Sequence, residues 1–377
     1  MKRFQLFSLV LFLLVGLSSC NRDHSIDPED ALEYEQYLKE EMEDQHISAL
    51  SVTLFRGNTL LYEKYMGIAD RENSTPLNSN HIFLLASVSK TITATALMQL
   101  FDQGEFGLDD AINDKLSFDV KHPDSNTPIT FRHLLTHTAG IADASSLDDQ
   151  YYYGEDSPVD LKQYMQDYLS VGGQYYDEKE NFEKFTPGDG YSYSNIGAAL
   201  MGVLVEEISG MGFNDYCIQH IFQPLGMTNT YWRLDETDTT TIVRPYEYVR
   251  RAYEPLQHYT FTDYPNGGLR SNGLDLMKFC GAFVNGGDFN GTRILEATTV
   301  AEMLKAQVSD FDEGQGLSFY ITGKAEGLWG HEGGEKGTTT VIAFHPSTQN
   351  GVIILTNASD VEIEAMAVSG YRLAEKL

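Results

Sequence analysis

The pattern of apolar and polar residues predicts strands near both ends of the chain. Residues 47–55 and 60–66 are rich in strand-forming side chains, and the sequence Arg-Gly-Asn at 56–58 between them is typical of a hairpin turn. Three further strand-like runs occupy the last quarter of the chain, at 316–322, 338–344 and 351–355. We therefore expect one sheet that is built from both chain termini.

Apolar residues recur at helical spacing in much of the remaining sequence. The predicted helices are 31–44, 87–103, 130–136, 159–169, 196–208, 213–221, 275–284 and 361–375. We expect an α/β fold in which a mainly helical subdomain is inserted into the sheet domain. The predicted sheet part covers about 33–110 and 255–377, and the predicted helical part covers about 111–254.

The first twenty residues have the pattern of an export signal. Lys2 and Arg3 precede an apolar run at 6–17, which is too short to cross a bilayer as a helix. The sequence Leu-Ser-Ser-Cys at 17–20 resembles the bacterial lipoprotein box, in which the cysteine receives a lipid. We predict a signal peptide over 1–20, lipidation at Cys20 and a polar tether over 21–32. The alternative is an ordinary cleaved signal peptide in which Cys20 is incidental.

These predictions place the protein in the bacterial cell envelope, anchored by lipid and facing the periplasm or the cell exterior. The formal net charge of −29 disfavours binding to nucleic acid or to anionic lipid. We expect a small-molecule or peptide substrate, a monomeric protein, and membrane contact through the anchor alone. No cofactor is implied, and no cysteine–histidine cluster has metal-ligand spacing. Cys217 and Cys280 can pair or remain thiols, and their apolar surroundings favour buried thiols.

The first candidate for catalysis is the run Ser87-Val88-Ser89-Lys90. A Ser-x-x-Lys pattern occurs by chance about once in a chain of this length, given average residue usage. The position adds weight, because Ser87 lies at a predicted helix start and Lys90 lies one turn later on the same face. A desolvated lysine can deprotonate a serine hydroxyl. The alternative is a helix-capping serine with a surface lysine.

The second candidate is the run Tyr193-Ser194-Asn195, which lies between a turn at 186–189 and the predicted helix from 196. A tyrosine close to an ammonium group can act as a general base. The Asn195 amide can donate to a substrate carbonyl. The alternative is a loop tyrosine that packs over the core, with Asn195 capping the next helix.

The third candidate is the run His331-Glu332-Gly333, which has glycines on both sides. A glycine-rich strand allows a substrate backbone to lie close alongside it. The alternative is a simple glycine turn in which His331 is a satisfied polar residue.

Six segments in a fixed order carry a resemblance to a known family. They are Ala86-Ser87-Val88-Ser89-Lys90-Thr91; His133-Leu134-Leu135-Thr136-His137-Thr138-Ala139-Gly140-Ile141; Phe185-Thr186-Pro187-Gly188 with Tyr193-Ser194-Asn195; Pro224-Leu225-Gly226-Met227; Gly267-Gly268-Leu269 with Asp275-Leu276; and Gly330-His331-Glu332-Gly333-Gly334. Together they resemble the serine β-lactamase-related family, which includes class C β-lactamases, D-alanyl-D-alanine carboxypeptidases, D-aminopeptidases and carboxylesterases. The resemblance covers about residues 33–377 and implies a β-lactamase/transpeptidase-like antiparallel sheet flanked by helices.

The resemblance also implies roles for individual residues. Ser87 attacks a carbonyl and is acylated, while Lys90 and Tyr193 share the proton transfers. Asn195 helps to position the substrate. The backbone N–H groups of Ser87 and Gly334 form the oxyanion hole, with Gly333 in the strand beside it.

One position departs from the family pattern. His331 stands where β-lactamases and carboxypeptidases of this group usually carry a lysine, which is a fixed cation for a substrate carboxylate. A neutral imidazole is a weaker anchor. We therefore expect a serine hydrolase of esterase or D-amino-acid peptidase or amidase type. The alternatives are a β-lactamase or D-alanyl-D-alanine carboxypeptidase, and a non-catalytic binding protein of the same fold.

Two further features have open interpretations. The tyrosine-rich acidic segment at 151–176 either forms a wall of the cleft or is a solvated loop. Arg270 either meets a substrate carboxylate or pairs with a surface acid. We favour the surface pair, because acidic residues outnumber basic ones so heavily.

Overall fold

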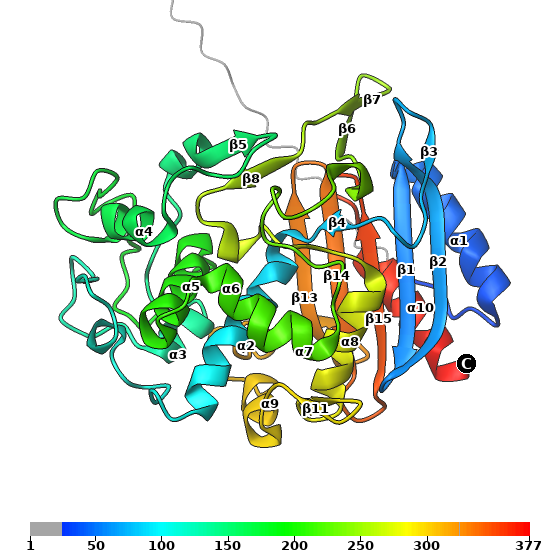
Figure 1. Cartoon of the computed structure of the whole chain (residues 1–377). Coiled ribbons are helices and arrows are strands. Elements are labelled where there is room, and N and C mark those ends of the chain that lie inside the picture. Colours follow the sequence, from blue (N-terminus) through cyan, green and yellow to red (C-terminus); the bar gives the residue numbers. More distant parts are fainter. Residues whose placement is uncertain (1–24, 324) are drawn as a thin grey trace, which may run out of the picture.

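The computed structural model describes residues 25–323 and 325–377, and a seven-stranded antiparallel sheet lies at its centre (Figure 1). In order across the sheet, the strands are β12 (Tyr320–Gly323), β13 (Leu328–Glu335), β14 (Thr338–Phe344), β15 (Asn350–Thr356), β1 (Ala49–Arg56), β2 (Thr59–Asp70) and β3 (Thr75–Pro76). The N-terminal hairpin β1–β2 pairs with the C-terminal strand β15. The expected sheet from both termini is therefore confirmed.

Helices cover both faces of this sheet, which explains why β1, β14 and β15 are buried along almost their whole length. On one face, α1 (Ala31–Asp44) and α10 (Glu364–Lys376) pack over the strands through an apolar cluster that includes Tyr34, Val52, Ile354 and Met366. On the other face, α8 (Gly273–Val284) packs against β1 and β15 (Figure 1). The layers are thus helix, sheet and helix.

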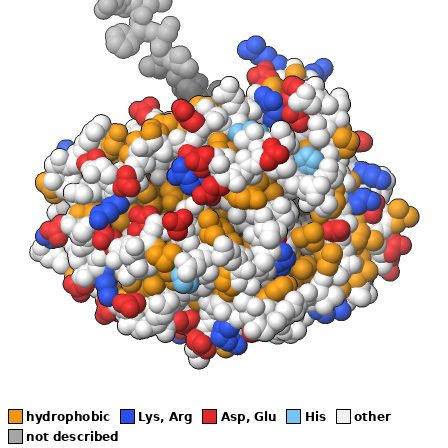
Figure 2. Space-filling model, viewed as in Figure 1, with side chains coloured by type: hydrophobic (Ala, Val, Ile, Leu, Met, Phe, Trp, Pro, Cys, Tyr) orange, Lys and Arg blue, Asp and Glu red, His pale blue; other side chains and the backbone are white. Residues whose placement is uncertain are grey.

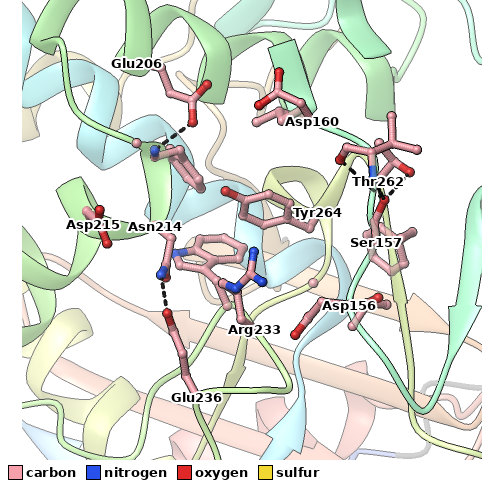
Figure 3. Close-up of a pocket in the computed structure, with 18 residues that line it drawn as sticks. Asp156, Ser157, Asp160, Glu206, Asn214, Asp215, Arg233, Glu236, Thr262 and Tyr264 are labelled. Carbon is pink, nitrogen blue, oxygen red and sulfur yellow. Dashed lines mark hydrogen bonds between the residues drawn. The ribbon is translucent and has the colours of Figure 1, made fainter. Parts of the chain in front are cut away.

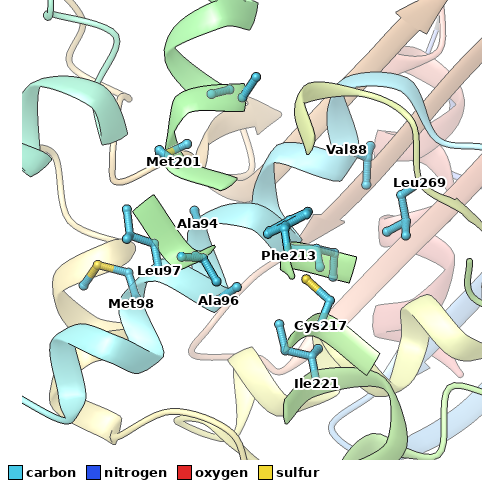
Figure 4. Close-up of a cluster of buried hydrophobic side chains, with 14 of the residues drawn as sticks. Val88, Ala94, Ala96, Leu97, Met98, Met201, Phe213, Cys217, Ile221 and Leu269 are labelled. Atoms are coloured by element: carbon cyan, nitrogen blue, oxygen red, sulfur yellow. The ribbon is translucent and has the colours of Figure 1, made fainter. Parts of the chain in front are cut away.

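Most of the remaining helices gather beside the sheet. They are α2 (Ser89–Asp102), α3 (Phe131–Leu135), α4 (Leu161–Leu169), α5 (Asn195–Ser209), α6 (Phe213–Cys217), α7 (Gln223–Leu225) and α9 (Ala297–Met303). Helix α2 is buried on nearly every side and packs against α5. Figure 4 shows Ala94 and Ala96 of α2 between Met201 of α5 and Cys217 of α6, all within one buried apolar cluster. This burial fixes α2, and with it Lys90, in the middle of the molecule.

The structure corrects the predicted boundaries of two elements. The strand expected over 316–322 begins only at Tyr320, because Ser318 has a φ of 57° that interrupts extended backbone. The helix expected over 213–221 divides into α6, a π-helical turn over Ile218–Phe222, and α7.

Four two-stranded ribbons were not predicted. They are β4 (Phe83–Leu84) with β9 (Arg270–Ser271), β5 (Tyr151–Tyr153) with β8 (Tyr259–Phe261), β6 (Tyr246–Val249) with β7 (Ala252–Pro255), and β10 (Asp288–Phe289) with β11 (Thr292–Arg293). Two of these ribbons flank the candidate site. Their strands are too short to produce a periodic pattern in the sequence.

The predicted signal peptide and Cys20 lie outside the described residues. Part of the predicted tether is described and lies against α10, where Ile26 N–H donates to Ser369 Oγ at 2.8 Å and Lys376 Nζ donates to Pro28 O at 2.7 Å. In the described part of the chain, no single helix is long and apolar enough to cross a membrane. The bent pair Asn195–Ser209 and Phe213–Leu225 meets that test by length and composition only.

The structure also shows how acidic side chains are distributed and decides the state of the two cysteines. On the face shown in Figure 2, acidic side chains are scattered over the surface and are not gathered in one patch. Cys217 and Cys280 are free and buried, which confirms the preference for separate thiols.

Candidate active site

Ser87 lies in a single 3-10 turn, Ala86–Val88, which connects β4 to α2. Ala86, the residue before it, has a φ of 48°, a left-handed conformation that is costly for any residue with a side chain. Hydrogen bonds hold the turn in place, because Leu85 N–H donates to Leu269 O at 2.8 Å and Thr340 Oγ1 donates to Leu85 O at 2.7 Å. The turn therefore presents Ser87 between α2 and the strands β13 and β14.

Lys90 is fully buried one turn into the helical segment. Its ammonium donates to Ser87 Oγ at 3.0 Å, to Asn195 Oδ1 at 2.7 Å and to the carbonyl of Asn266 at 2.8 Å. These three bonds match the three N–H groups of the side chain. The structure thus brings together Ser87, Lys90 and Asn195, which come from two separate sequence motifs.

Burial lowers the pKa of Lys90 to about 7, against the smaller opposing effects of Asp143, Asp263 and Glu335. Near neutral pH a large share of the Lys90 side chains is therefore the neutral amine. A neutral amine in contact with a serine hydroxyl can accept its proton.

Tyr193 lies beside this pair at the mouth of the site, where 38% of its surface is exposed. Lys90 Nζ lies 4.8 Å from the centre of the Tyr193 ring. Desolvation raises the pKa of the Tyr193 phenol well above its usual range, and the hydrogen bond with Ser87 lowers it by less. The phenol is therefore protonated at neutral pH and suits proton donation better than proton removal.

Asp143 holds the loop that carries Tyr193 and Asn195. Asp143 Oδ1 accepts from Ser194 Oγ at 3.2 Å and from Ile196 N–H at 3.1 Å, and Oδ2 accepts from Asn195 N–H at 2.9 Å. Ser194 itself caps α5 by accepting from the backbone of the third helical residue. A carboxylate at a helix N-terminus is stabilised by the helix dipole. Asp143 is a positioning residue that the sequence analysis missed.

His137 is a second residue that the sequence analysis did not assign. Its Nδ1 accepts from Ser194 N–H at 3.2 Å, and its ring centre lies 4.5 Å from that of Tyr193. Its place inside the 133–141 segment marked it as part of a motif. The contact between His137 and the loop at Ser194, more than fifty residues away, is not visible as a pattern in the sequence.

Strand β13 forms the opposite wall. Its pairing with β12 ends at Gly330, so in the described structure residues 331–335 have a ladder partner only in β14. A Cβ atom at Gly333 would lie 2.2 Å from Leu85 O, so only glycine allows β13 to approach the Ser87 turn this closely. Gly334 follows at an exposed position where a Cβ atom would touch nothing. An extended substrate can lie along this edge.

His331 is 2% exposed and lies on β13 within the same wall. Its Nδ1 is 2.5 Å from Glu332 O, a distance that requires Nδ1 to carry the proton and donate. Burial, followed by the charge of Lys90, lowers the pKa of His331 to about 3. The imidazole is therefore neutral at physiological pH and supplies no fixed cation.

The tyrosine-rich segment contributes to the same end of the site. Tyr151, on β5, donates from its hydroxyl to Glu335 Oε2 at 2.9 Å, at the end of β13. Lys336 Nζ lies 3.9 Å from the centre of the Tyr151 ring. Further along the segment, Tyr164 and Tyr168 are buried in the core. Part of the segment therefore packs against the end of β13 and part of it against the core.

The prediction that Arg270 pairs with a surface acid is wrong. Arg270 is 2% exposed, and its guanidinium donates to the carbonyls of Gly268 and Tyr259. The short ribbon of β4 and β9 turns this side chain inward, a placement that overall charge composition does not predict. Arg270 is also too buried to meet a substrate carboxylate.

A separate pocket on the helical side is shown in Figure 3. Its carboxylates belong to Asp156, Asp160, Glu206, Asp215 and Glu236, and it has a volume of about 370 Å³. Several of these groups have internal partners: Glu206 accepts from Phe213 N–H and Glu236 accepts from Asn214 Nδ2. Within residues 25–323 and 325–377, no group of three or more histidine, cysteine or acidic side chains is arranged to hold a metal ion.

Comparison with known proteins decides the family. The family model described as Beta-lactamase matches residues 34–370. The chain belongs to the Beta-lactamase family. The family resemblance and the expected fold are thereby confirmed, and so is the expectation of a serine hydrolase.

This Beta-lactamase family chain is similar both to proteins named as penicillin-binding proteins and to a protein named as an esterase. It is 32% identical over 197 residues to penicillin-binding protein 4* of Bacillus subtilis (strain 168), covering 52% of this chain and 40% of that protein. It is 30% identical over 208 residues to esterase EstB of Burkholderia gladioli, covering 52% and 48%. The matches thus span less than half of either relative. A solved penicillin-binding protein from Bacillus halodurans superposes with a TM-score of 0.71 at 25% identity, covering 88% of this chain and 98% of that one.

Proposed function

We propose that this Beta-lactamase family hydrolase cleaves uncharged esters or amides through an acyl-enzyme on Ser87, as an esterase or a D-amino-acid peptidase or amidase. The observation that carries the proposal is the 3.0 Å contact between Lys90 Nζ and Ser87 Oγ. The lysine is buried, and its pKa is lowered to about 7. A nucleophile and a base in direct contact are what acyl transfer requires.

In the acylation step, the neutral amine of Lys90 removes the Ser87 proton as Oγ forms a bond to the substrate carbonyl carbon. The carbonyl oxygen gains negative charge, which the backbone N–H groups of Ser87 and Gly334 stabilise. When the tetrahedral intermediate collapses, the bond to the leaving group breaks. The protonated phenol of Tyr193 gives the leaving group its proton and regains one from the Lys90 ammonium.

In the second step, the neutral amine of Lys90 removes a proton from water as the water oxygen attacks the acyl-enzyme carbonyl. Lys90 then returns this proton to Ser87 Oγ when the bond between Oγ and the acyl carbon breaks. Asn195 is held by Lys90 on one side and by the helix start on the other, so its amide is fixed for contact with the substrate. The whole cycle uses side chains and backbone N–H groups that the described site contains.

The charges around β13 support uncharged substrates. A cation at the position of His331 would hold the free carboxylate of a substrate, but the His331 imidazole is neutral. Glu332 and Glu335 flank the glycines of the same strand, and burial raises the pKa of Glu332. These groups repel or fail to hold a carboxylate, so an ester or amide without one is favoured.

We also propose that the protein is exported and anchored by lipid at Cys20, as the first twenty residues predict. The net charge of −29 disfavours nucleic acid and anionic lipid as partners. We therefore propose that the protein contacts the membrane through its lipid alone. We propose that the protein is a monomer and that its substrate is a small molecule or a peptide. Incorporation of an alkyne-labelled fatty acid by the wild type, and not by Cys20→Ala, tests the anchor.

A panel of substrates tests the proposed activity. We expect turnover of p-nitrophenyl esters or D-amino-acid anilides, with much slower turnover of nitrocefin and of D-alanyl-D-alanine peptides. Faster turnover of nitrocefin than of any neutral substrate would favour a β-lactamase. Inactivity across the whole panel, with a folded protein, would favour a non-catalytic binding protein.

A further inference from the structure

Arg270 is buried directly behind the segment that carries Ser87. Only 2% of its surface is exposed. Its Nη1 donates to Gly268 O at 3.0 Å and its Nη2 donates to Tyr259 O. Its Nε finds no hydrogen-bond partner among the described residues. A guanidinium has five N–H donors, so these two bonds leave part of its donor capacity unused.

The charge of Arg270 also lacks a direct partner. No carboxylate in the described part of the chain forms an ion pair with it. Asp156 acts on Arg270 through space, but the Asp156 oxygens accept from the backbone N–H groups of Leu234, at 3.0 Å, and Asp235, at 2.9 Å. Burial lowers the pKa of Arg270 to about 10, so it remains charged at neutral pH. A buried charge is costly unless a counter-charge accompanies it.

Arg270 lines a small cavity whose other polar groups are already occupied. Thr338 Oγ1 donates to Leu84 O at 3.1 Å. Asn357 uses its oxygen to accept from Ala49 N–H at 2.6 Å and its amide to donate to Arg244 O at 2.9 Å. The cavity lining contains no carboxylate. Among the side chains of this lining, Arg270 is the one with a fully buried polar atom that has no partner in the described part of the chain.

A second basic side chain faces the same cavity. His258 belongs to its lining, and burial, Arg270 and Arg244 together lower the His258 pKa to about 4. The positive charges of Arg270 and Arg244 therefore reach the position of His258, with Asp70 as the smaller opposing charge, although the chain as a whole carries a charge of −29. The local potential therefore favours an anion.

The size of the cavity limits which anion fits. Its volume is about 10 Å³, which is about the space that one water-sized particle needs. A carboxylate, phosphate or sulfate has several heavy atoms and is excluded. We propose that this cavity is a halide-binding site, occupied by chloride and held by the Nε–H of Arg270.

A halide at this position would stabilise the segment that carries the nucleophile Ser87. Arg270 pairs with Leu84 in the ribbon of β4 and β9, and the chain runs from Leu84 through Leu85 into the Ser87 turn. Thr338, on β14, is tied to Leu84 as well. The ion would join β4, β9 and β14 at one point. The site is independent of the substrate proposed above.

Thermal unfolding in chloride tests the site. Chloride is titrated from 0.1 to 50 mM against gluconate, which is too large for the cavity, at constant ionic strength. Because chloride binds only the folded state, we expect the unfolding midpoint of the wild type to rise by at least about 2 °C. Arg270→Gln should lose this rise. Arg132→Gln is the matched control and should keep it, because Arg132 is paired with Asp109, does not line the cavity and does not act on Arg270 or His258. No rise in the wild type, or an equal rise in Arg270→Gln, would overturn the proposal.

Bromide provides a second measurement that needs no variant. Crystals of the wild type grown in bromide should show an anomalous difference peak beside Arg270 Nε. A water molecule at that position, with bromide elsewhere or nowhere, would refute the halide site even if Arg270→Gln fails to fold.

Discussion

The pKa of Lys90 leads to a specific pH dependence of acylation. With a pKa of about 7, half of the Lys90 side chains are neutral at pH 7. With the ordinary lysine value near 10.4, the neutral fraction at that pH would be smaller by about a thousandfold. Because the neutral amine is the base, kcat/KM should rise with pH through 7 and level off above about pH 8. At pH 5 it should be about one hundredth of the plateau value.

The assay is the initial rate of p-nitrophenyl ester hydrolysis between pH 5 and 9, at substrate concentrations well below KM. The enzyme is returned to pH 7.5 after each exposure, so that loss of fold is separated from titration. Since kcat/KM reports the free enzyme, the midpoint belongs to Lys90 within its acidic surroundings. A profile that is flat over this range, or that is still rising tenfold per pH unit at pH 9, would refute Lys90 as the base.

Asp143→Asn tests whether a nearby negative charge raises the pKa of Lys90. The Asp143 charge raises the pKa of Lys90, so its removal should move the midpoint to lower pH, by a few tenths of a unit because Asp143 is exposed. Asp119→Asn is the matched control, an exposed acid paired with Lys121 that does not act on Lys90. A shift to higher pH in Asp143→Asn, or an equal shift in the control, would contradict the argument.

Three substitutions test other parts of the site. Tyr193→Phe should lower kcat/KM about a hundredfold for an anilide, which needs a proton on its leaving group, and much less for a p-nitrophenyl ester; equal losses would exclude proton donation. Asp143→Ala should cost about 1–2 kcal/mol of unfolding free energy and reduce kcat more than it changes KM, whereas Asp143→Asn should retain part of the cap; unchanged stability and kcat would remove its positioning role. His331→Lys should raise nitrocefin turnover relative to ester turnover about tenfold; an unchanged ratio in the folded variant would show that the cation does not set specificity.

Local features of the sequence predicted much of the fold. The helix at 31–44 matches α1 at both ends, and the hairpin turn at 56–58 has Gly57 in a left-handed conformation. Serine and lysine three residues apart at a helix start indicated a reactive pair. Each of these features depends on interactions within about one turn of chain, which a sequence pattern can report.

Contacts between distant segments were not predictable in the same way. Asp143 reaches Ser194 from 51 residues away, and nothing in either segment specifies the other. Asn266 contributes its backbone carbonyl to Lys90, so its side chain type gives no indication of the role. Arg270 was assigned by composition, but the ribbon of β4 and β9 decides its position. Tertiary packing sets all three.

The central claim is that Ser87 is the acylating nucleophile, activated by Lys90. The most direct measurement is intact-mass analysis after treatment with a fluorophosphonate, on wild type and Ser87→Ala in parallel. The wild type should gain the mass of one phosphonyl group with loss of fluoride, and Ser87→Ala should gain none. If both proteins gain the same mass, or neither does, Ser87 is not the nucleophile.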